Sequence, residues 1–220
     1  MRKINVTSEI APLKKVLLHR PGKELLNLTP DTLGRLLFDD IPFLPVAIKE
    51  HEEFAQILKD NGVEVVYLED LMAEVLDLSD EIRDKFIKQF VYEAGIRAPK
   101  YKKLAIKYLK NIKDNKELVL KTMEGIQISD ISKEEREIDR SLTDLIDEED
   151  KFIADPMPNL YFTRDPFASI GNGISLNKMY SVTRNRETIY AEYIFNYHPD
   201  YKDKLDKYYD RYLPYHIEGG

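Results

Sequence analysis

The chain has 220 residues, enough to bury a sizeable hydrophobic core in one or two domains. Its 40 acidic and 33 basic side chains give a net charge of −7, which argues against a general role in binding nucleic acids. It has no cysteine, so disulfides and thiolate metal sites are excluded. No run approaches the roughly 18 apolar residues that span a bilayer. No secretory signal follows the first residues, so we expect a cytoplasmic protein with no membrane partner.

The beginning of the chain has the pattern of a compact β/α unit. Residues 14–19 are predicted to form a strand. A helix should begin at Pro30, because the fixed φ of proline suits a first helical turn. A longer helix should begin at Leu44, since apolar side chains then recur at three- and four-residue steps. Residues 63–68 are predicted to form the next strand.

The segment 72–150 has a different pattern of charged and apolar residues. Charge rises, alternation disappears, and apolar residues take helical spacing, which predicts an inserted helical module. The apolar positions are Ile82, Phe86, Ile87, Phe90, Leu104, Ile106, Leu109, Leu118, Leu120, Leu142, Leu145 and Ile146. The alternative, a charged disordered linker, is disfavoured by this periodicity. Lysines between 100 and 110 fall at helical spacing and are interpreted as a solvated helix face.

A run bracketed by prolines, PNLYFTRDP from Pro158 to Pro166, carries the most chemical information. It is apolar and β-prone, and proline cannot donate to a strand ladder, so we predict a strand that starts and stops at these prolines. The end of this strand would present Asn159 and Asp165 at the rim of a site. A carboxylate there suits a cationic ligand, because its paired oxygens match a guanidinium fork. An equally open alternative is a surface ion pair between Arg164 and Asp165.

The last part of the chain returns to a β/α pattern. We expect strands at 167–170 and 174–176 on either side of an Asn172-Gly173 turn, then a helix over about 186–197. A further β-prone segment leads into Gly219-Gly220. Glycines permit a sharp turn and imply continuation, so we expect the chain to be a portion of a longer protein.

These residues together resemble the arginine deiminases. The resemblance extends over nearly the whole chain, in several blocks that follow one another in the right order. The blocks are HRPGKEL from His19, LTP from Leu28, LLFDD from Leu36, EHEEF from Glu50, EAGIR from Glu93, KTMEG from Lys121, PNLYFTRDP from Pro158, GNG from Gly171, SLNKMY from Ser175 and RNRET from Arg184. Several ordered blocks are far more specific than one short motif.

The resemblance implies an α/β fold in which five ββαβ units form a pentein-like propeller around a central channel, with a helical insertion. This chain would then be a partial propeller. Residues 1–71 would form the first β/α unit, 72–150 the helical insertion domain, and 151–220 the second β/α unit and the start of a third.

The reaction that the resemblance implies is hydrolysis of L-arginine to L-citrulline and ammonia, in arginine catabolism. A guanidinium carbon is a poor electrophile, so a cysteine thiolate attacks it, ammonia leaves, and water then attacks the thiouronium intermediate. No metal or other cofactor is required. The implied partners are L-arginine and further copies of the chain in a homo-oligomer.

The resemblance also implies roles for particular side chains. Asp165 matches the carboxylate that binds the reacting guanidinium, and Glu218 the carboxylate that supports the catalytic histidine. The amino-acid end of the substrate would be held by Asn159 and Arg184, with Phe162 as an apolar wall and Leu37 on a loop that lines the pocket. Because Arg184 and Arg186 lie two residues apart, one of them could be a solvated neighbour, and we favour Arg184 for the site.

The chain departs from the family in having no cysteine. The family's nucleophile, its catalytic histidine and a second guanidinium-binding carboxylate are absent, so we expect an inactive portion of the enzyme. His216 is a weak alternative base. Two other functions stay open: a non-catalytic arginine-binding or regulatory module, and another guanidine-modifying hydrolase or amidinotransferase. The inserted helical segment favours the deiminase, since the smaller dimethylarginine hydrolases lack it.

Overall fold

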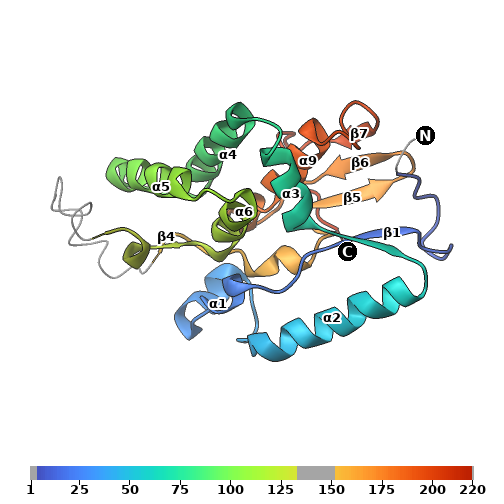
Figure 1. Cartoon of the computed structure of the whole chain (residues 1–220), viewed down its shortest axis with the longest axis horizontal. Coiled ribbons are helices and arrows are strands. Elements are labelled where there is room, and N and C mark those ends of the chain that lie inside the picture. Colours follow the sequence, from blue (N-terminus) through green and yellow to red (C-terminus); the bar gives the residue numbers. More distant parts are fainter. Residues whose placement is uncertain (1–3, 133–151, 220) are drawn as a thin grey trace.

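The structure, a computed structural model, describes residues 4–132 and 152–219 and shows a mixed α/β arrangement of helices with small sheets (Figure 1). The expected α/β class is therefore confirmed. The described residues form two two-stranded sheets and one three-stranded sheet, none of them closed. Within these residues, no helix combines the length and apolar character that crossing a membrane requires.

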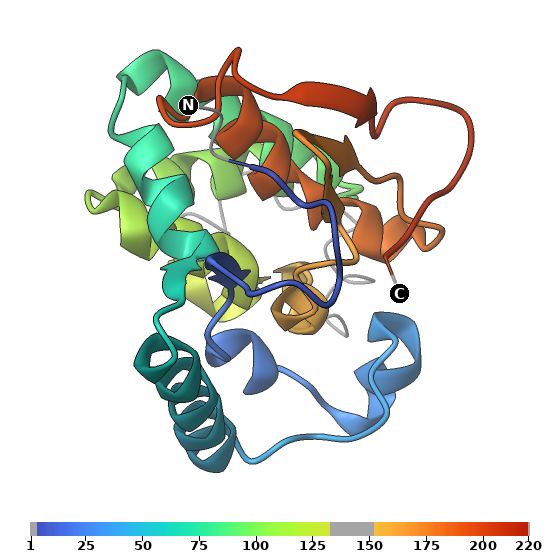
Figure 2. The ribbon, with the colours of Figure 1, turned by 90° about the vertical axis from the view of Figure 1, so that its right-hand side faces the viewer.

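The first β/α elements lie where the sequence predicts them. Strand β1 (Lys15–Leu18) pairs in parallel with β2 (Glu64–Tyr67), and the connection between them carries α1 (Pro30–Leu36) and α2 (Leu44–Asp60). Helix α1 begins with a capping box in which Thr29 and Thr32 satisfy each other's backbone N–H groups. The segment before β1 is bridged to the turn at Gly171 and then curves round to β1 (Figure 2).

The helices predicted after residue 72 are present, although the first of them begins earlier, at Leu68. The helices are α3 (Leu68–Leu76), α4 (Asp80–Glu93), α5 (Pro99–Asn111) and α6 (Asn115–Glu124). Ser79 and Asp114 cap α4 and α6 by accepting bonds from backbone N–H groups in the first turn, which explains these starts. A short strand, β3 (Ile126–Gln127), follows where only helix was expected. The predicted helical positions Leu142, Leu145 and Ile146 lie outside the described residues.

The strand predicted for Asn159–Asp165 is wrong. After β4 (Phe152–Ala154), residues Pro158–Tyr161 form a 3-10 helix, and the chain then turns twice before the next strand, β5 (Phe167–Ile170). Proline at the first helical position pre-sets φ for helix entry. The backbone N–H of Phe162 bonds to Asn159 O, and that of Asp165 bonds to Phe162 O, so local turns replace the ladder bonds of a strand.

The next two strands and the longer helix lie where the sequence predicts them, whereas β7 and α8 were not predicted. β5 (Phe167–Ile170) and β6 (Gly173–Leu176) form an antiparallel hairpin, and β7 (Asp206–Tyr209) adds to β6 in parallel. Between β6 and β7 lie a short helix, α8 (Val182–Asn185), and α9 (Thr188–Tyr197).

One hydrophobic core joins the helical segment to the last β/α elements. Helix α3 packs against α6 on one side and α9 on the other (Figure 1). The ring of Phe86, on α4, lies 6.0 Å from that of Tyr190 and 5.4 Å from that of Tyr193, both on α9. Such ring pairs add about 0.5–1.5 kcal/mol beyond their buried area. The division into units at residues 71 and 150 stays a prediction.

Candidate functional site

Asp165 and Arg184, predicted to act on opposite ends of a substrate, are brought into direct contact. Nη2 of Arg184 lies 3.0 Å from Oδ2 of Asp165, although the two residues come from different elements. The Asp165 side chain is 23% exposed and that of Arg184 is 11% exposed, so the pair is half-buried. The carboxylate therefore holds a guanidinium in a partly desolvated place, where charged hydrogen bonds are strongest. Arg164, in contrast, pairs with Glu9, so the alternative pairing of Arg164 with Asp165 is not formed.

The position of Asp165 is fixed through its backbone. Asn177, which follows β6 and is buried, donates from Nδ2 to Asp165 O at 2.8 Å. Ser175 in turn donates to Oδ1 of Asn177 at 2.7 Å. Thr163 donates to Leu17 O at 3.2 Å, which ties the same turn to β1. The Asn177 amide thus supplies a donor to the Asp165 carbonyl, which lies in a turn outside the strand ladder.

A third charged residue, Glu187, completes the group around Arg184. Its carboxylate accepts from Nε of Arg184 at 3.1 and 3.2 Å and from Nη2 at 3.0 Å. Glu187 is 3% exposed, and this burial raises its pKa to about 7, although the Arg184 charge and hydrogen bonds partly offset the rise. Hydrogen bonds and charge from the two carboxylates raise the pKa of Arg184 above its ordinary value, although burial opposes this.

Arg186 is not the solvated neighbour that the spacing allowed. It is 4% exposed, and its guanidinium donates to Pro156 O at 2.8 Å and to Thr183 O at 3.3 Å. Burial lowers its pKa from the ordinary value. Arg186 thus fixes the backbone of α8, the helix that carries Arg184.

Asn159, Leu37 and Phe162 form a second group beside the first. Asn159 is buried and donates from Nδ2 to Leu36 O at 2.7 Å, so it holds the end of α1. Leu37 then takes a left-handed backbone conformation, φ 56° and ψ 46°, with its side chain 55% exposed. This conformation costs about 1–2 kcal/mol for a residue with a Cβ. Phe162 is exposed and stacks on Tyr161, with 3.9 Å between ring centroids.

Glu218 lies on the segment that runs beside residues 178–180. Its Oε1 accepts from the backbone N–H of Tyr180 at 2.5 Å, and Ile217 donates to Lys178 O at 3.0 Å. The next residue, Gly219, packs so closely on the backbone of Arg164 that a Cβ there would collide with the Arg164 carbonyl. Glycine thus allows the Glu218 segment to approach the turn that carries Asp165.

Two of the four histidines, His19 and His216, have polar partners that bear on the predicted roles. His19 is buried between two carboxylates, with Nδ1 at 2.9 Å from Glu69 and Nε2 at 3.1 Å from Glu24. His216, the weak alternative base, places Nδ1 2.9 Å from Met179 O. In residues 4–132 and 152–219, no group of three or more His, Asp or Glu side chains is arranged to hold a metal ion.

Comparison with known proteins shows the family to which the chain belongs. The sequence family described as arginine deiminase matches residues 34–220. The chain belongs to the arginine deiminase family. It is 61% identical over 220 residues to the arginine deiminase of Treponema denticola. This match covers 100% of this chain and 53% of that protein. It is 58% identical over 217 residues to the arginine deiminases of Streptococcus agalactiae and Streptococcus sanguinis, covering 99% of this chain and 52% and 53% of theirs. The chain therefore spans about half the length of these curated relatives.

Membership of the arginine deiminase family confirms the resemblance that the sequence motifs indicate. The individual site residues remain predictions. The structure arranges five of them as two adjoining groups, and the Glu218 side chain instead bonds to the backbone of Tyr180. Backbone hydrogen bonds from Phe162 N to Asn159 O and from Asp165 N to Phe162 O join the groups. Glu187 was not singled out in the sequence. Its signal is present, however, as an Arg-x-x-Glu spacing at the start of a helix, which allows an i,i+3 ion pair.

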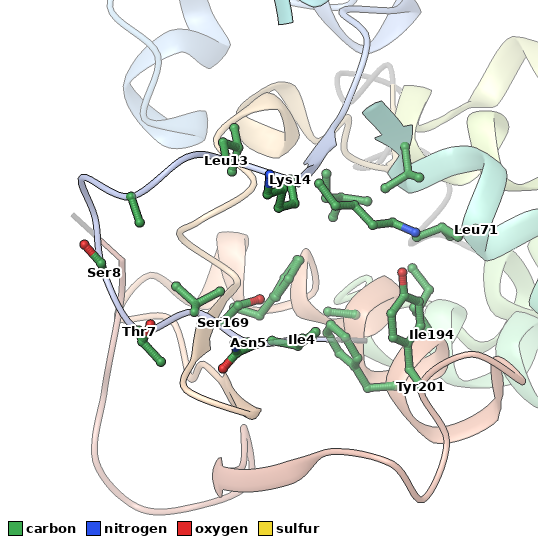
Figure 3. A pocket seen from close by; sticks show the side chains of 18 of the residues that line it. Ile4, Asn5, Thr7, Ser8, Leu13, Lys14, Leu71, Ser169, Ile194 and Tyr201 are labelled. Carbon is green, nitrogen blue, oxygen red and sulfur yellow. The ribbon is translucent and has the colours of Figure 1, made fainter. Parts of the chain in front are cut away.

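A separate hollow lies beneath the N-terminal segment of this deiminase-family chain (Figure 3). It has a volume of about 240 Å³ and contains none of the six predicted site residues in its lining. Its walls are mainly apolar, including Leu17, Leu71, Phe167 and Ile194. The hollow therefore lies apart from the Asp165 group.

Proposed function

We propose that the protein containing this chain hydrolyses L-arginine to L-citrulline and ammonia in arginine catabolism. The observation that carries the proposal is the contact between Asp165 and Arg184, in which a half-buried carboxylate binds a guanidinium. A substrate guanidinium presents the same planar donors, so the same carboxylate suits it. Family membership supports the proposal, since the similar proteins are named arginine deiminases.

In this proposal the two groups of residues have different tasks. Asp165 binds the reacting guanidinium and stabilises its charge as the carbon becomes tetrahedral. Arg184 and Asn159 hold the amino-acid end, while Phe162 and the Leu37 loop wall the pocket. Glu218 orients a histidine that transfers protons.

The covalent step needs a thiolate, and the 220 residues contain no cysteine. In the proposal, the nucleophile and the catalytic histidine come from a part of the protein outside these residues. Thiolate chemistry of this kind uses neither a metal nor an organic cofactor. We further propose a cytoplasmic homo-oligomer with a five-unit propeller. Residues 1–71 and 151–220 would contribute β/α units to it, and residues 72–150 an inserted helical domain.

The test is citrulline formation by the complete protein. Wild-type protein should convert arginine to citrulline, and Asp165→Ala should lose detectable turnover because the guanidinium loses its carboxylate partner. Glu9→Gln is a matched control, since it removes a nearby carboxylate whose partner is the exposed Arg164. Absence of turnover in the wild-type protein, or near-normal kcat in Asp165→Ala, would contradict the proposal.

A further inference from the structure

The guanidinium of Arg184 is held by one particular edge. Its Nε and Nη2 groups face Glu187, and Nη2 also contacts Asp165. Guanidinium has five N–H donors in a rigid fork, so fixing the Nε–Nη2 edge fixes the direction of the remaining nitrogen. In the part of the chain that the structure describes, Nη1 of Arg184 has no protein partner. Two N–H donors are therefore left for a ligand.

The position of Glu187 in the fold allows it to hold the Arg184 guanidinium in one orientation. The residue lies at the junction between α8 and α9, and its N–H bonds to Arg184 O at 2.9 Å, so one turn of backbone connects the two side chains. A buried carboxylate is costly unless it is paired and hydrogen-bonded. The Glu187 carboxylate meets this requirement through three contacts with Arg184.

We propose that Glu187 is a positioning residue that aims the free Nη1 of Arg184 at the α-carboxylate of arginine. This inference rests on the proposed function, because it assigns Glu187 to the amino-acid end of the same substrate. Glu187 acts through Arg184 and does not touch the reacting carbon. Asp165 contacts the same guanidinium at a single oxygen, which by itself leaves the plane of the fork free to rotate.

The expected effect is specific for substrates that carry an α-carboxylate. Glu187→Gln keeps the size of the side chain and removes the charge that fixes the fork. Misaligning Arg184 weakens a contact that does not change during the reaction, so KM rises and kcat changes little. Agmatine, which is arginine without its α-carboxylate, makes no contact with Nη1 and serves as the comparison.

The experiment measures steady-state kinetics of the complete deiminase with arginine, and the inhibition constant of agmatine as a competitor. For Glu187→Gln we expect KM for arginine to rise about tenfold or more, kcat to stay within about threefold, and the agmatine constant to stay near that of wild type. Glu192→Gln is the matched control, because Glu192 is a carboxylate on α9 that pairs with Arg211 instead. The control should leave all three quantities near their wild-type values.

An unchanged KM for arginine in Glu187→Gln would overturn the inference, and so would equal weakening of arginine and agmatine, which would indicate a merely structural role. If Glu187→Gln does not fold, Glu187→Asp supplies the test, since its shorter carboxylate cannot span Nε and Nη2. The same selective rise in KM is expected there. A wild-type protein without arginine turnover would instead overturn the proposed function, and this inference with it.

Discussion

The guanidinium of Arg184 lies 3.0 Å from the carboxylate of Asp165, so the carboxylate proposed to bind a substrate guanidinium binds one from its own chain. The contact joins the turn before β5 to α8 and is held from both sides. Asn177 fixes the backbone of Asp165, and Glu187 fixes the other edge of Arg184. The two residues are therefore preorganised relative to each other before any ligand arrives.

Replacing Arg184 by alanine in the complete enzyme should weaken arginine binding more than it slows the chemical step. Arg184 is proposed to contact the carboxylate end of the substrate, which does not change during the reaction. Loss of a charged hydrogen bond of about 1.5–3 kcal/mol should raise KM by about 10- to 150-fold. Steady-state kinetics of Arg184→Ala beside Asp165→Ala measure this difference. A fall in kcat with unchanged KM in Arg184→Ala would place that residue at the reacting end.

The 220-residue chain by itself should form no citrulline from arginine. It contains no cysteine, and oxygen nucleophiles or water would lack the covalent route. A colorimetric citrulline assay of the purified chain, with a heat-killed sample as control, measures this. Turnover above that control would show that the reaction does not depend on a thiolate.

Much of the fold follows from the sequence because local periodicity and caps specify it. The helix at Leu44 and the hairpin around Gly173 lie where apolar spacing and turn residues predict them. The failure over Asn159–Asp165 has a local cause. The composition is β-prone, but Pro158 starts a 3-10 helix and the Asn159 side chain bonds to Leu36 O, 123 residues away in sequence. A tertiary contact of this kind is invisible to a local pattern.

The site shows the same division between local and long-range information. Glu187 could be found from its spacing to Arg184, because an i,i+3 pair is a local feature. The surroundings of His19 could not, since Glu69 lies 50 residues farther along the chain and is brought near by the pairing of β1 with β2. The burial of Arg186 likewise depends on its contact with Pro156 O, in another segment.

His19 should make the stability of the protein sensitive to alkaline pH. Both ring nitrogens face carboxylate oxygens, so both must carry protons. Burial alone lowers the pKa of His19, but hydrogen bonds and charge from Glu24 and Glu69 more than offset it and raise the pKa to about 9. Because the folded pKa exceeds the ordinary 6.5, the stabilisation is complete below about pH 6.5 and is lost as pH rises through 9. Its size is on the order of 3 kcal/mol.

Urea unfolding of the protein between pH 6 and 10 measures this contribution. In Glu69→Gln, His19 loses one carboxylate partner, so the fall in stability should begin at a lower pH than in wild type. Glu53→Gln is the control, since Glu53 forms an exposed i,i+4 pair with Lys49. Identical pH profiles for wild type and Glu69→Gln would show that His19 is not the titrating group.

Glu187 should make arginine binding sensitive to pH near neutrality. Burial raises its pKa to about 7, while Arg184 and Arg186 act in the opposite direction and Asp165 adds to the rise. The carboxylate is therefore charged above pH 7, where it fixes the Arg184 fork, and protonated below it. KM for arginine in the complete enzyme should rise as pH falls below about 7 and level off above it. In Glu187→Gln, KM should already be high at pH 8 and should lack this dependence around pH 7. A wild-type and a variant profile of the same shape would mean that another group controls substrate binding in this range.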